Sequence, residues 1–393
     1  MKKRFLVFLL AALLIASMTA CTGNDNPETD TTAAEETTLP EETTAPDVAP
    51  TPGAASDATV VKLNYGTVDI FTYGIRELED ASMLNCDQVG SGFEIKIDSE
   101  GGTVAVRTRT ADATAFRVFV DGVGVKTADG SDYFVINGVK NIEFEVTAGE
   151  HTVRVIRVSD AIVGAASFYN ITFEGKQMVH ADSTEEPLRV EFVGDGITAG
   201  EGLAESGDVT QAYSYLTAHK LNADYAITAF TGKGLATGAT PIATAYSKSG
   251  NYDTPADVIV VNVGLEDVAL TGDDAVTAED LAKAYEELLK TIRQKNGPTA
   301  KVVCVTTSAN EVLTAAVTAA VESVGGNAAG YYAKALTASA AKLPTAAEHA
   351  AYADELVAYI TSIKDNEVVS PELVGSASGY GVEIDYASGE WKS

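Results

Sequence analysis

Four short segments in the second half of the chain are apolar almost throughout, and they restrict the possible folds more than any other feature. Helix-like stretches separate them, such as residues 277–297, where the apolar residues share one face: Leu281, Tyr285, Leu288, Leu289 and Ile292. Strands without polar alternation are buried on both faces, which is typical of a parallel sheet covered by helices. We therefore expect one α/β domain over residues 186–366. The four segments are LRVEFVG (188–194), ADYAITAF (223–230), ADVIVVNVG (256–264) and AKVVCVTT (300–307).

The first half of the chain follows a different pattern. Between residues 60 and 178, short runs alternate apolar and polar residues, and Gly, Asp and Asn residues separate these runs. Short strands at such spacing predict an antiparallel β-sandwich. The chain as a whole is therefore expected to be a two-domain α+β protein. The runs are GFEIKI (92–97), FRVFV (116–120), IEFEV (142–146), HTVRVIRV (151–158) and SFYNITF (167–173).

The chain begins with MKKRFLVFLLAALLIASMTAC, which has a basic start, an apolar stretch and small residues before Cys21. This layout is typical of a secretory signal. It also resembles the bacterial lipobox, so we expect residues 1–21 to be a lipoprotein signal peptide and Cys21 to be acylated. The alternative is an ordinary signal peptide with an incidental cysteine. Nothing else in the sequence is apolar for long enough to span a bilayer. The predicted location is the bacterial cell surface, outside the cytoplasm, with a lipid anchor as the membrane contact.

Acidic residues dominate the composition. Residues 22–58 contain nine acidic residues and no basic or aromatic ones, which predicts a disordered, self-repelling spacer. Residues 367–393 form an acidic tail. The formal net charge of −29 argues against nucleic acid and anionic lipid surfaces as partners. Cys86 and Cys304 are interpreted as buried apolar residues, and neither a metal site nor a cofactor is expected.

Three glycine-containing turns follow the predicted strands of the α/β domain. They are GDG (194–196), TGKG (231–234) and GLED (264–267). In open parallel sheets, ligands bind beyond the carboxyl ends of the strands, so we expect these turns to lie on one rim. Glycine lets backbone N–H groups approach a ligand closely, although it also ends strands for conformational reasons alone.

The ordered series GDGIT, TGKG, VNVGLED and LPTAAEH resembles the four blocks of the GDSL or SGNH hydrolases. With the β-sandwich before it, the arrangement resembles carbohydrate esterase family two, whose members are exported deacetylases of plant-type polysaccharides. The likeness covers nearly everything after the spacer. It implies a jelly-roll-like sandwich followed by a flavodoxin-like α/β/α SGNH-hydrolase domain with a parallel sheet.

The resemblance also implies which positions would carry catalysis, and most of them are changed. Gly196 stands where the family has its serine nucleophile, and Glu266 stands where it has an asparagine that donates to the oxyanion. Leu343 replaces the histidine base, and Ala341 replaces the aspartate that orients it. Gly232 keeps the backbone donor of the second block. A serine mechanism that lacks its nucleophile, base and acid is disabled, which predicts a pseudoenzyme.

Several functions remain open at this point. The leading hypothesis is a surface lipoprotein that binds a glycan or an acetylated polysaccharide, or that serves as a scaffold. The first alternative is a hydrolase of cell-wall or plant polysaccharides with a rearranged site, in which Asp195 and Glu266 act as paired carboxylates. The second is a domain that displays the tail or docks a partner protein. Tyr252 could stack on a sugar or simply pack in its loop, and His349 matches a second, non-catalytic histidine of the family. The predicted binding cleft consists of Asp195, Gly232, Gly234, Tyr252, Glu266 and His349.

Overall fold

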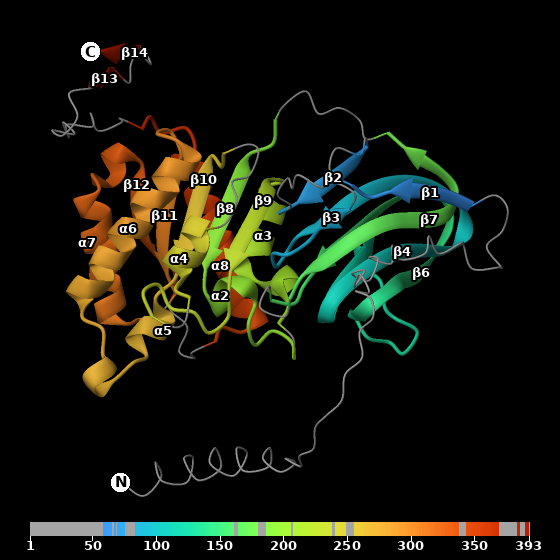
Figure 1. Cartoon of the computed structure of the whole chain (residues 1–393), viewed down its shortest axis with the longest axis horizontal. Helices are drawn as coiled ribbons and strands as arrows, with labels where there is room; N and C mark the ends of the chain where they lie inside the picture. Colours follow the sequence, from blue (N-terminus) through green and yellow to red (C-terminus); the bar gives the residue numbers. More distant parts are fainter. Residues whose placement is uncertain are drawn as a thin grey trace, which may run out of the picture. The chain divides into compact units, whose positions relative to one another are not determined.

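The computed structural model describes most of the chain after the predicted spacer (Figure 1). Cys21, Tyr252 and Ala341 lie outside the described residues. Residues 55–393 form one compact unit. In the part that the structure describes, no helix is long and apolar enough to cross a membrane. The described residues are 58–64, 67, 69–74, 83–160, 164–179, 186–205, 207–237, 240–248, 255–307, 309–337 and 343–368, with the backbone of 383–385 and 390–392.

The first half forms a seven-stranded antiparallel sheet. Strands β1, β7, β4 and β2 are hydrogen-bonded neighbours in that order, β3 pairs with β7, and β5 and β6 pair with β4. Figure 1 shows the long strands curving together around one core. The bounds are β1 (Ala58–Lys62), β2 (Ile70–Tyr73), β3 (Leu84–Asn85), β4 (Gly92–Val120), β5 (Val123–Gly124), β6 (Phe134–Arg157) and β7 (Ala166–Met178).

The strands of this sheet are longer than the sequence pattern predicts. GFEIKI and FRVFV both lie in β4, and IEFEV and HTVRVIRV both lie in β6. The polar and glycine residues between these runs do not end the strands, because the antiparallel partner continues opposite them, as at Gly102 and Val146. The register shifts between Thr110 and Thr114, and such irregularities bend a long strand without breaking its ladder.

The second half forms a five-stranded sheet in the order β12-β11-β10-β8-β9, with every neighbouring pair parallel. The order corresponds to 2-1-3-4-5 along the chain, the flavodoxin-like arrangement. All four predicted strands are confirmed, and a fifth, at the edge of the sheet, was not predicted. The bounds are β8 (Arg189–Gly194), β9 (Asp224–Ala229), β10 (Val258–Asn262), β11 (Lys301–Thr306) and β12 (Tyr331–Ala335).

Helices cover both faces of the parallel sheet. Successive strand residues point to opposite sides, so apolar strands give the sheet two apolar faces that must be buried. In β10, Val258 and Val260 join one core cluster, whereas Ile259 and Val261 join another. The first cluster includes residues of α2, α3 and α8, and the second includes residues of α4, α6 and α7. The bounds are α2 (Gly196–Ala199), α3 (Tyr213–Lys220), α4 (Ile242–Lys248), α5 (Leu265–Val268), α6 (Ala278–Asn296), α7 (Glu311–Ser323) and α8 (Ala346–Ile363), with 3-10 turns at Val209–Gln211, Gly272–Asp274 and Gly326–Ala329.

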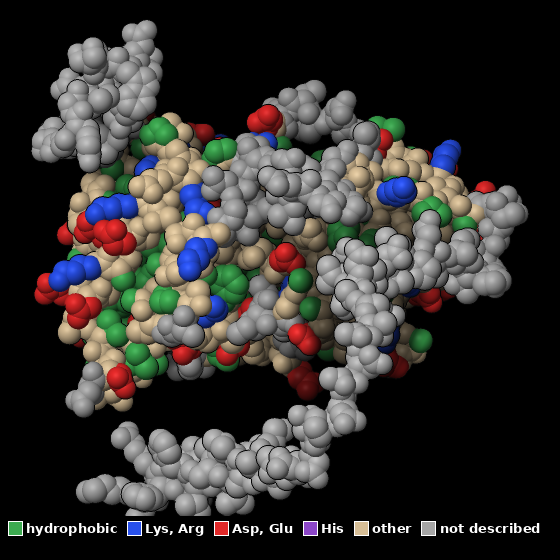
Figure 2. Space-filling model, viewed as in Figure 1, with side chains coloured by type: hydrophobic (Ala, Val, Ile, Leu, Met, Phe, Trp, Pro, Cys, Tyr) green, Lys and Arg blue, Asp and Glu red, His purple; other side chains and the backbone are tan. Residues whose placement is uncertain are grey.

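The predicted helix at 277–297 is α6. Thr277 accepts a hydrogen bond from the Asp280 N–H and caps the helix, and all five predicted apolar side chains are buried. Its outer face carries ion pairs, including Lys283 with Glu279. At the left of Figure 2, basic and acidic side chains are accordingly interspersed.

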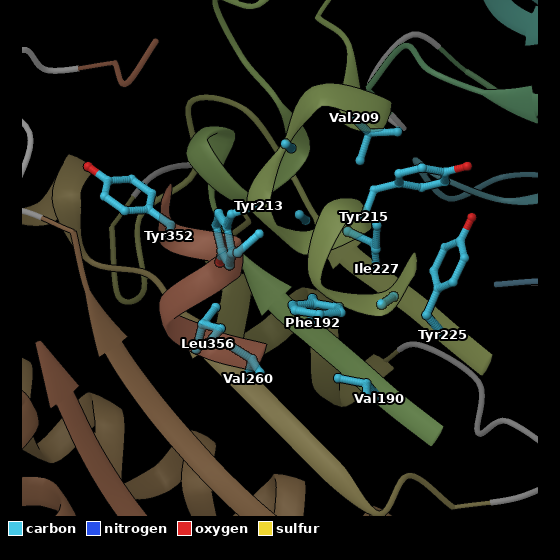
Figure 3. Packing of buried hydrophobic residues seen from close by; sticks show 14 of the residues in the cluster. Val190, Phe192, Val209, Tyr213, Tyr215, Tyr225, Ile227, Val260, Tyr352 and Leu356 are labelled. Atoms are coloured by element: carbon cyan, nitrogen blue, oxygen red, sulfur yellow. The ribbon is translucent and has the colours of Figure 1, made fainter. Parts of the chain in front are cut away.

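The first core cluster also contains residues of the antiparallel half, so the two sheets share one hydrophobic core. Val89 and Ile156 belong to the same cluster as Phe192 and Ile227. Figure 3 shows how the aromatic residues Tyr213, Tyr215 and Tyr225 line this cluster next to β8 and β9. The Tyr225 ring stacks on Tyr73 at 5.2 Å between centroids, and its hydroxyl donates to the Gly90 carbonyl at 2.9 Å.

Asp208 forms a second link between the halves. Its carboxylate is fully buried and accepts hydrogen bonds from the Tyr133 hydroxyl at 3.0 Å and from Arg117 at 3.4 Å. It also caps the turn at Val209–Gln211 by accepting from the Thr210 N–H at 2.9 Å. A buried carboxylate with this many donors is well compensated for its lost hydration.

Cys86 and Cys304 are buried and unpaired, as the sequence suggests. Burial raises the pKa of both thiols to about 12, so neither is a reactive thiolate at neutral pH. Near the end of the chain, β13 (Glu383–Asp385) and β14 (Glu390–Lys392) pair antiparallel within the predicted tail.

Candidate active site

The three glycine-containing turns meet at the carboxyl ends of β8, β9 and β10, as predicted. The Asp195 N–H donates to the Asn262 carbonyl at 3.3 Å, and the Phe230 N–H donates to the Gly194 carbonyl at 3.2 Å. At Gly194 a Cβ would stand 2.0 Å from the Thr198 hydroxyl, so only glycine lets α2 start this close to the strand end.

Asp195 is the N-cap of α2 and is 3% exposed. Its carboxyl accepts a hydrogen bond from the Ile197 N–H at 3.2 Å. Burial is the largest cause of a pKa of about 7 for Asp195; the negative charges of Glu266 and Glu201 also raise this pKa, and backbone hydrogen bonds lower it. The sequence suggested the proximity of Asp195 and Glu266, and the structure adds a third acid.

Glu201 occupies the space next to Gly196. A Cβ built on Gly196 would lie 1.9 Å from Oε2 of Glu201 and 3.0 Å from its Cδ. A serine hydroxyl oxygen sits about 1.4 Å from its Cβ, so the carboxylate oxygen lies close to where a nucleophile's side chain would be. The position that lacks its serine is thus not empty, because a carboxylate fills it.

The turn after β9 is held by two carboxylates that the sequence analysis did not single out. Asp267, fully buried in α5, accepts hydrogen bonds from the N–H groups of Leu235 at 2.5 Å and Ala236 at 3.0 Å. A Cβ on Gly234 would lie 2.6 Å from the Asp267 carboxylate, so glycine is needed there for packing. Asp160, from the antiparallel half, accepts from the Thr231 N–H at 2.6 Å.

Gly232 lies on the exposed part of the same turn. Its φ of 69° is in the left-handed region that favours glycine. Apart from its two chain neighbours, no described residue has an atom within 4 Å of a Cβ built there. Its backbone is therefore accessible to a ligand, unlike that of buried Gly234.

Leu343 comes close to the first block. A Cβ built on Gly202 would lie 3.0 Å from Cδ1 of Leu343, and Leu343 packs against the first core cluster. Its side chain offers no proton acceptor. An apolar side chain thus lies near the turn that carries Gly196, where the resemblance places a base.

His349 is fully buried and supports α3. Its Nδ1 accepts a hydrogen bond from the Tyr213 N–H at 3.1 Å, and the two rings stack at 6.0 Å between centroids. Burial lowers the pKa of His349 to about 4, which keeps the ring neutral at pH 7. Its Nε2 has no hydrogen-bond partner among the described residues. These contacts give His349 a structural role.

The rim therefore brings together three acids, an accessible backbone turn and an apolar side chain. Among the described residues, no group of His, Cys, Asp and Glu has the geometry to hold a metal ion. Asp267 follows Glu266 in the third block and matches the aspartate of the family's Gly-x-Asn-Asp, so the motif could have identified it. Nothing in the sequence pattern indicates Glu201, because its position depends on the turn after α2.

A separate hollow of about 700 Å³ runs along the outer face of α7. None of the rim residues lines it. Its lining combines small side chains with two glutamates from a single helix face, so it offers no set of converging polar groups: Ala309, Glu311, Thr314, Ala315, Thr318, Ala319 and Glu322.

Comparison with known proteins places the rim in a family context. Residues 192–366 match the model of the GDSL-like lipase/acylhydrolase family. No curated protein matches the chain by sequence. Solved structures resemble both halves of the chain, because the similar regions cover 75–78% of it.

Three solved structures illustrate the likeness. A family two carbohydrate esterase from Cellvibrio japonicus has 17% identity and a TM-score of 0.66, with 78% of this chain and 99% of that chain covered. One from Clostridium thermocellum, in complex with cellohexaose, has 22% identity and a TM-score of 0.62, with 75% and 98% covered. The acetyl xylan esterase Est2A from the rumen bacterium Butyrivibrio proteoclasticus has 17% identity and a TM-score of 0.64, with 78% and 98% covered.

Proposed function

We propose that this chain, in which residues 192–366 form a GDSL-like lipase/acylhydrolase domain in a family two carbohydrate esterase architecture, is a catalytically inactive protein that binds a glycan or serves as a scaffold at the cell surface. One observation carries the proposal. The nucleophile's position is Gly196, and the carboxylate of Glu201 lies 1.9 Å from where a side chain would begin.

Inactivity follows from the chemistry of the rim. Esterases of this kind need an oxygen nucleophile, a base that takes its proton and donors for the oxyanion. Gly196 has no side chain, and Leu343 cannot accept a proton. Glu201 and Glu266 bring negative charge to the place where negative charge would have to develop. Gly232 retains the backbone donor that the resemblance places in the second block.

Glycan binding is supported by what the rim retains. Loss of a nucleophile does not remove the shape or the hydrogen-bonding groups of a binding site. Gly232 keeps an exposed backbone. The carboxylates of Glu201 and Glu266, which lie near Asp195, can accept hydrogen bonds. The similar esterase from Clostridium thermocellum was solved with cellohexaose, so an oligosaccharide is the first ligand to test.

The proposal includes an anchored location. Residues 1–21 would direct export, Cys21 would carry the lipid, and residues 22–58 would separate the folded unit from the membrane. It also includes a jelly-roll-like sandwich for the antiparallel half. The long, bent strands β4 and β6 support this arrangement, because they wrap around a single core cluster that contains Phe93, Phe116 and Phe168.

The alternative is a hydrolase that uses the carboxylates. It is favoured by the pKa of about 7 for Asp195, a value that suits a general acid. Against it stand the burial of Asp195 and its hydrogen bond to the Ile197 N–H, which give the carboxyl a structural task in capping α2.

A combined assay tests the two functions. The purified chain is expected to release no acetate above background from acetylated xylo-oligosaccharides or aryl acetates, while calorimetry detects binding of cellohexaose or of xylo-oligosaccharides. Acetate release that persists through repurification and disappears in Asp195→Asn or Glu266→Gln would overturn inactivity and support the carboxylate alternative. Absence of binding across the oligosaccharide panel would overturn the glycan-binding role.

A further inference from the structure

The position of Glu201 is set by the backbone. Gly200 ends α2 in the left-handed region, with φ 84°, and the Glu201 N–H donates to the Gly196 carbonyl at 2.8 Å. A Cβ on Gly200 would lie 2.6 Å from the Asp208 carbonyl, so this turn requires glycine for two reasons. The turn brings residue 201 back over the first residue of α2, and the glutamate side chain then reaches the space beside Gly196.

A carboxylate in this place changes what the site can recognise. An ionised carboxylate only accepts hydrogen bonds. The carbonyl oxygen of an acetyl ester also only accepts, so the two groups repel each other at close range. A free sugar hydroxyl can donate a hydrogen bond, and a bond to a charged acceptor is among the stronger ones. Glu201 can therefore accept a hydrogen bond from a free sugar hydroxyl, at the position where the resemblance to the esterases predicts the ester group of a substrate.

Two neighbours reinforce this preference. Glu266 adds a second negative charge close enough to act on Asp195 together with Glu201. Leu343, beside Gly202, supplies neither a donor nor an acceptor. Among the described side chains at this end of the rim, the carboxylates of Glu201 and Glu266 provide hydrogen-bond acceptors.

The geometry points to Glu201 as a specificity-determining residue that makes the rim select unesterified sugar, by accepting a hydrogen bond from the hydroxyl that carries the acetyl group in an esterase substrate. This inference rests on the proposed glycan-binding function and deepens it. It names the ligand class as deacetylated oligosaccharide, the product of the deacetylases that the fold resembles.

The first test compares matched ligands. The full chain, purified in detergent, is titrated by calorimetry with acetylated xylo-oligosaccharides, with the same preparation after alkaline deacetylation, and with cellohexaose. We expect the deacetylated ligands to bind at least about tenfold more tightly than the acetylated one, as expected for a hydrogen bond to a charged group. Glu201→Gln should reduce this preference to about twofold or less, because an amide can also donate to a carbonyl. Glu205→Gln, an exposed acid in the same turn region, is the control and should keep the preference.

The second test uses the space beside Gly196. Gly196→Ala adds a Cβ that displaces the Glu201 carboxylate, and its backbone is outside the left-handed region, so alanine is compatible with the fold. We expect the same loss of preference as in Glu201→Gln, and no further loss in the double variant, because both changes remove one contact.

The outcomes separate the two proposals. Equal binding of acetylated and deacetylated ligands, or a preference that survives both Glu201→Gln and Gly196→Ala, overturns the role of Glu201 and leaves glycan binding intact. Failure of every oligosaccharide to bind overturns the proposed function and this inference with it.

Discussion

Gly196 and Glu201 determine what a restoration of esterase activity would require. The family resemblance suggests four changes: Gly196→Ser, Glu266→Asn, Ala341→Asp and Leu343→His. We expect this four-site variant to stay near background, because the serine Cβ pushes the Glu201 carboxylate aside without removing its charge, which still opposes the developing oxyanion.

Adding Glu201→Ala should raise aryl acetate hydrolysis at least about tenfold above the four-site variant. Glu205→Ala in place of Glu201→Ala serves as the control. A four-site variant that hydrolyses the ester as fast as the five-site variant would show that Glu201 leaves the site when a serine arrives.

Asp195 and His349 predict opposing effects of pH on stability. Asp195 has a raised pKa in the folded state, from an ordinary 3.8 to about 7, so it favours folding when protonated and its contribution is lost as pH rises through 7. His349 has a lowered pKa, from 6.5 to about 4, so the unfolded state gains a proton first and stability is lost as pH falls from 6.5 to 4. The two trends oppose each other between pH 4 and 6.5.

Single variants should separate these trends. In Asp195→Asn, the free energy of unfolding should fall more steeply on acidification from pH 6.5 to 4 than in the natural chain, by up to about 4 kcal/mol. In His349→Asn, whose amide oxygen can still accept from the Tyr213 N–H, acidification over this range should be stabilising. Urea unfolding at several pH values measures both. Parallel pH profiles for the two variants would contradict the assignment.

At the scale of single residues, the sequence predicts which residues occupy the family's catalytic positions, but it does not predict which side chains lie beside them in the fold. The missing nucleophile and base at Gly196 and Leu343 can be read directly from the four blocks. The carboxylate beside Gly196 cannot, because it arrives through the left-handed turn at Gly200. His349 is buried against Tyr213, a residue 136 positions away in the chain.

At the scale of elements, the buried strands were predictable because their apolar runs are continuous. β12 was missed, because YYAKA at the sheet edge has a mixed composition and only Tyr331 and Tyr332 are buried. The antiparallel strands were predicted as short pieces, because their continuity depends on a partner far away in sequence.

The turn after β9 gives a prediction at this scale. Asp267→Ala leaves the N–H groups of Leu235 and Ala236 without their acceptor, and we expect it to lower the free energy of unfolding by about 3 kcal/mol. Asp274→Ala, on an exposed 3-10 turn, should change stability by less than about 0.5 kcal/mol. Chemical denaturation compares the two. Equal effects would mean that the turn is held by other contacts.

At the scale of the whole molecule, the shared core predicts that the two halves behave as one body. A site-specific protease sequence placed in the segment HADSTEEP (residues 180–187), which joins the two halves, should yield two fragments that stay together in gel filtration after cleavage. Tyr225→Ala combined with Asp208→Ala should weaken their association, because it removes both the stacked aromatic contact and the buried link.

Asp354→Ala is the matched control, since it removes only an exposed ion pair with Lys220. Fragments that separate without any substitution would show that the halves associate weakly. Limited proteolysis of the uncut chain should favour the predicted spacer (residues 22–58) and the tail (residues 367–393) over the joining segment HADSTEEP.

The predicted anchor is tested on the intact cell. Cys21→Ala should release the protein into the medium or leave it unprocessed, because the lipid is the proposed tether. Fractionation followed by immunoblotting distinguishes these outcomes. Membrane retention equal to that of the natural chain would contradict the lipid anchor.

The contact between Gly196 and Glu201 also bears on how such a site could change over generations. If Gly196→Ser occurred first, the serine would lie beside the negatively charged Glu201. If Glu201 were replaced first, the site would still contain no nucleophile at position 196. Neither step alone is expected to improve hydrolysis, and Glu266, Ala341 and Leu343 would still have to change, so selection for that activity has no single improving step to act on. The proposed loss of hydrolysis is therefore difficult to reverse by single substitutions in descendants of this chain.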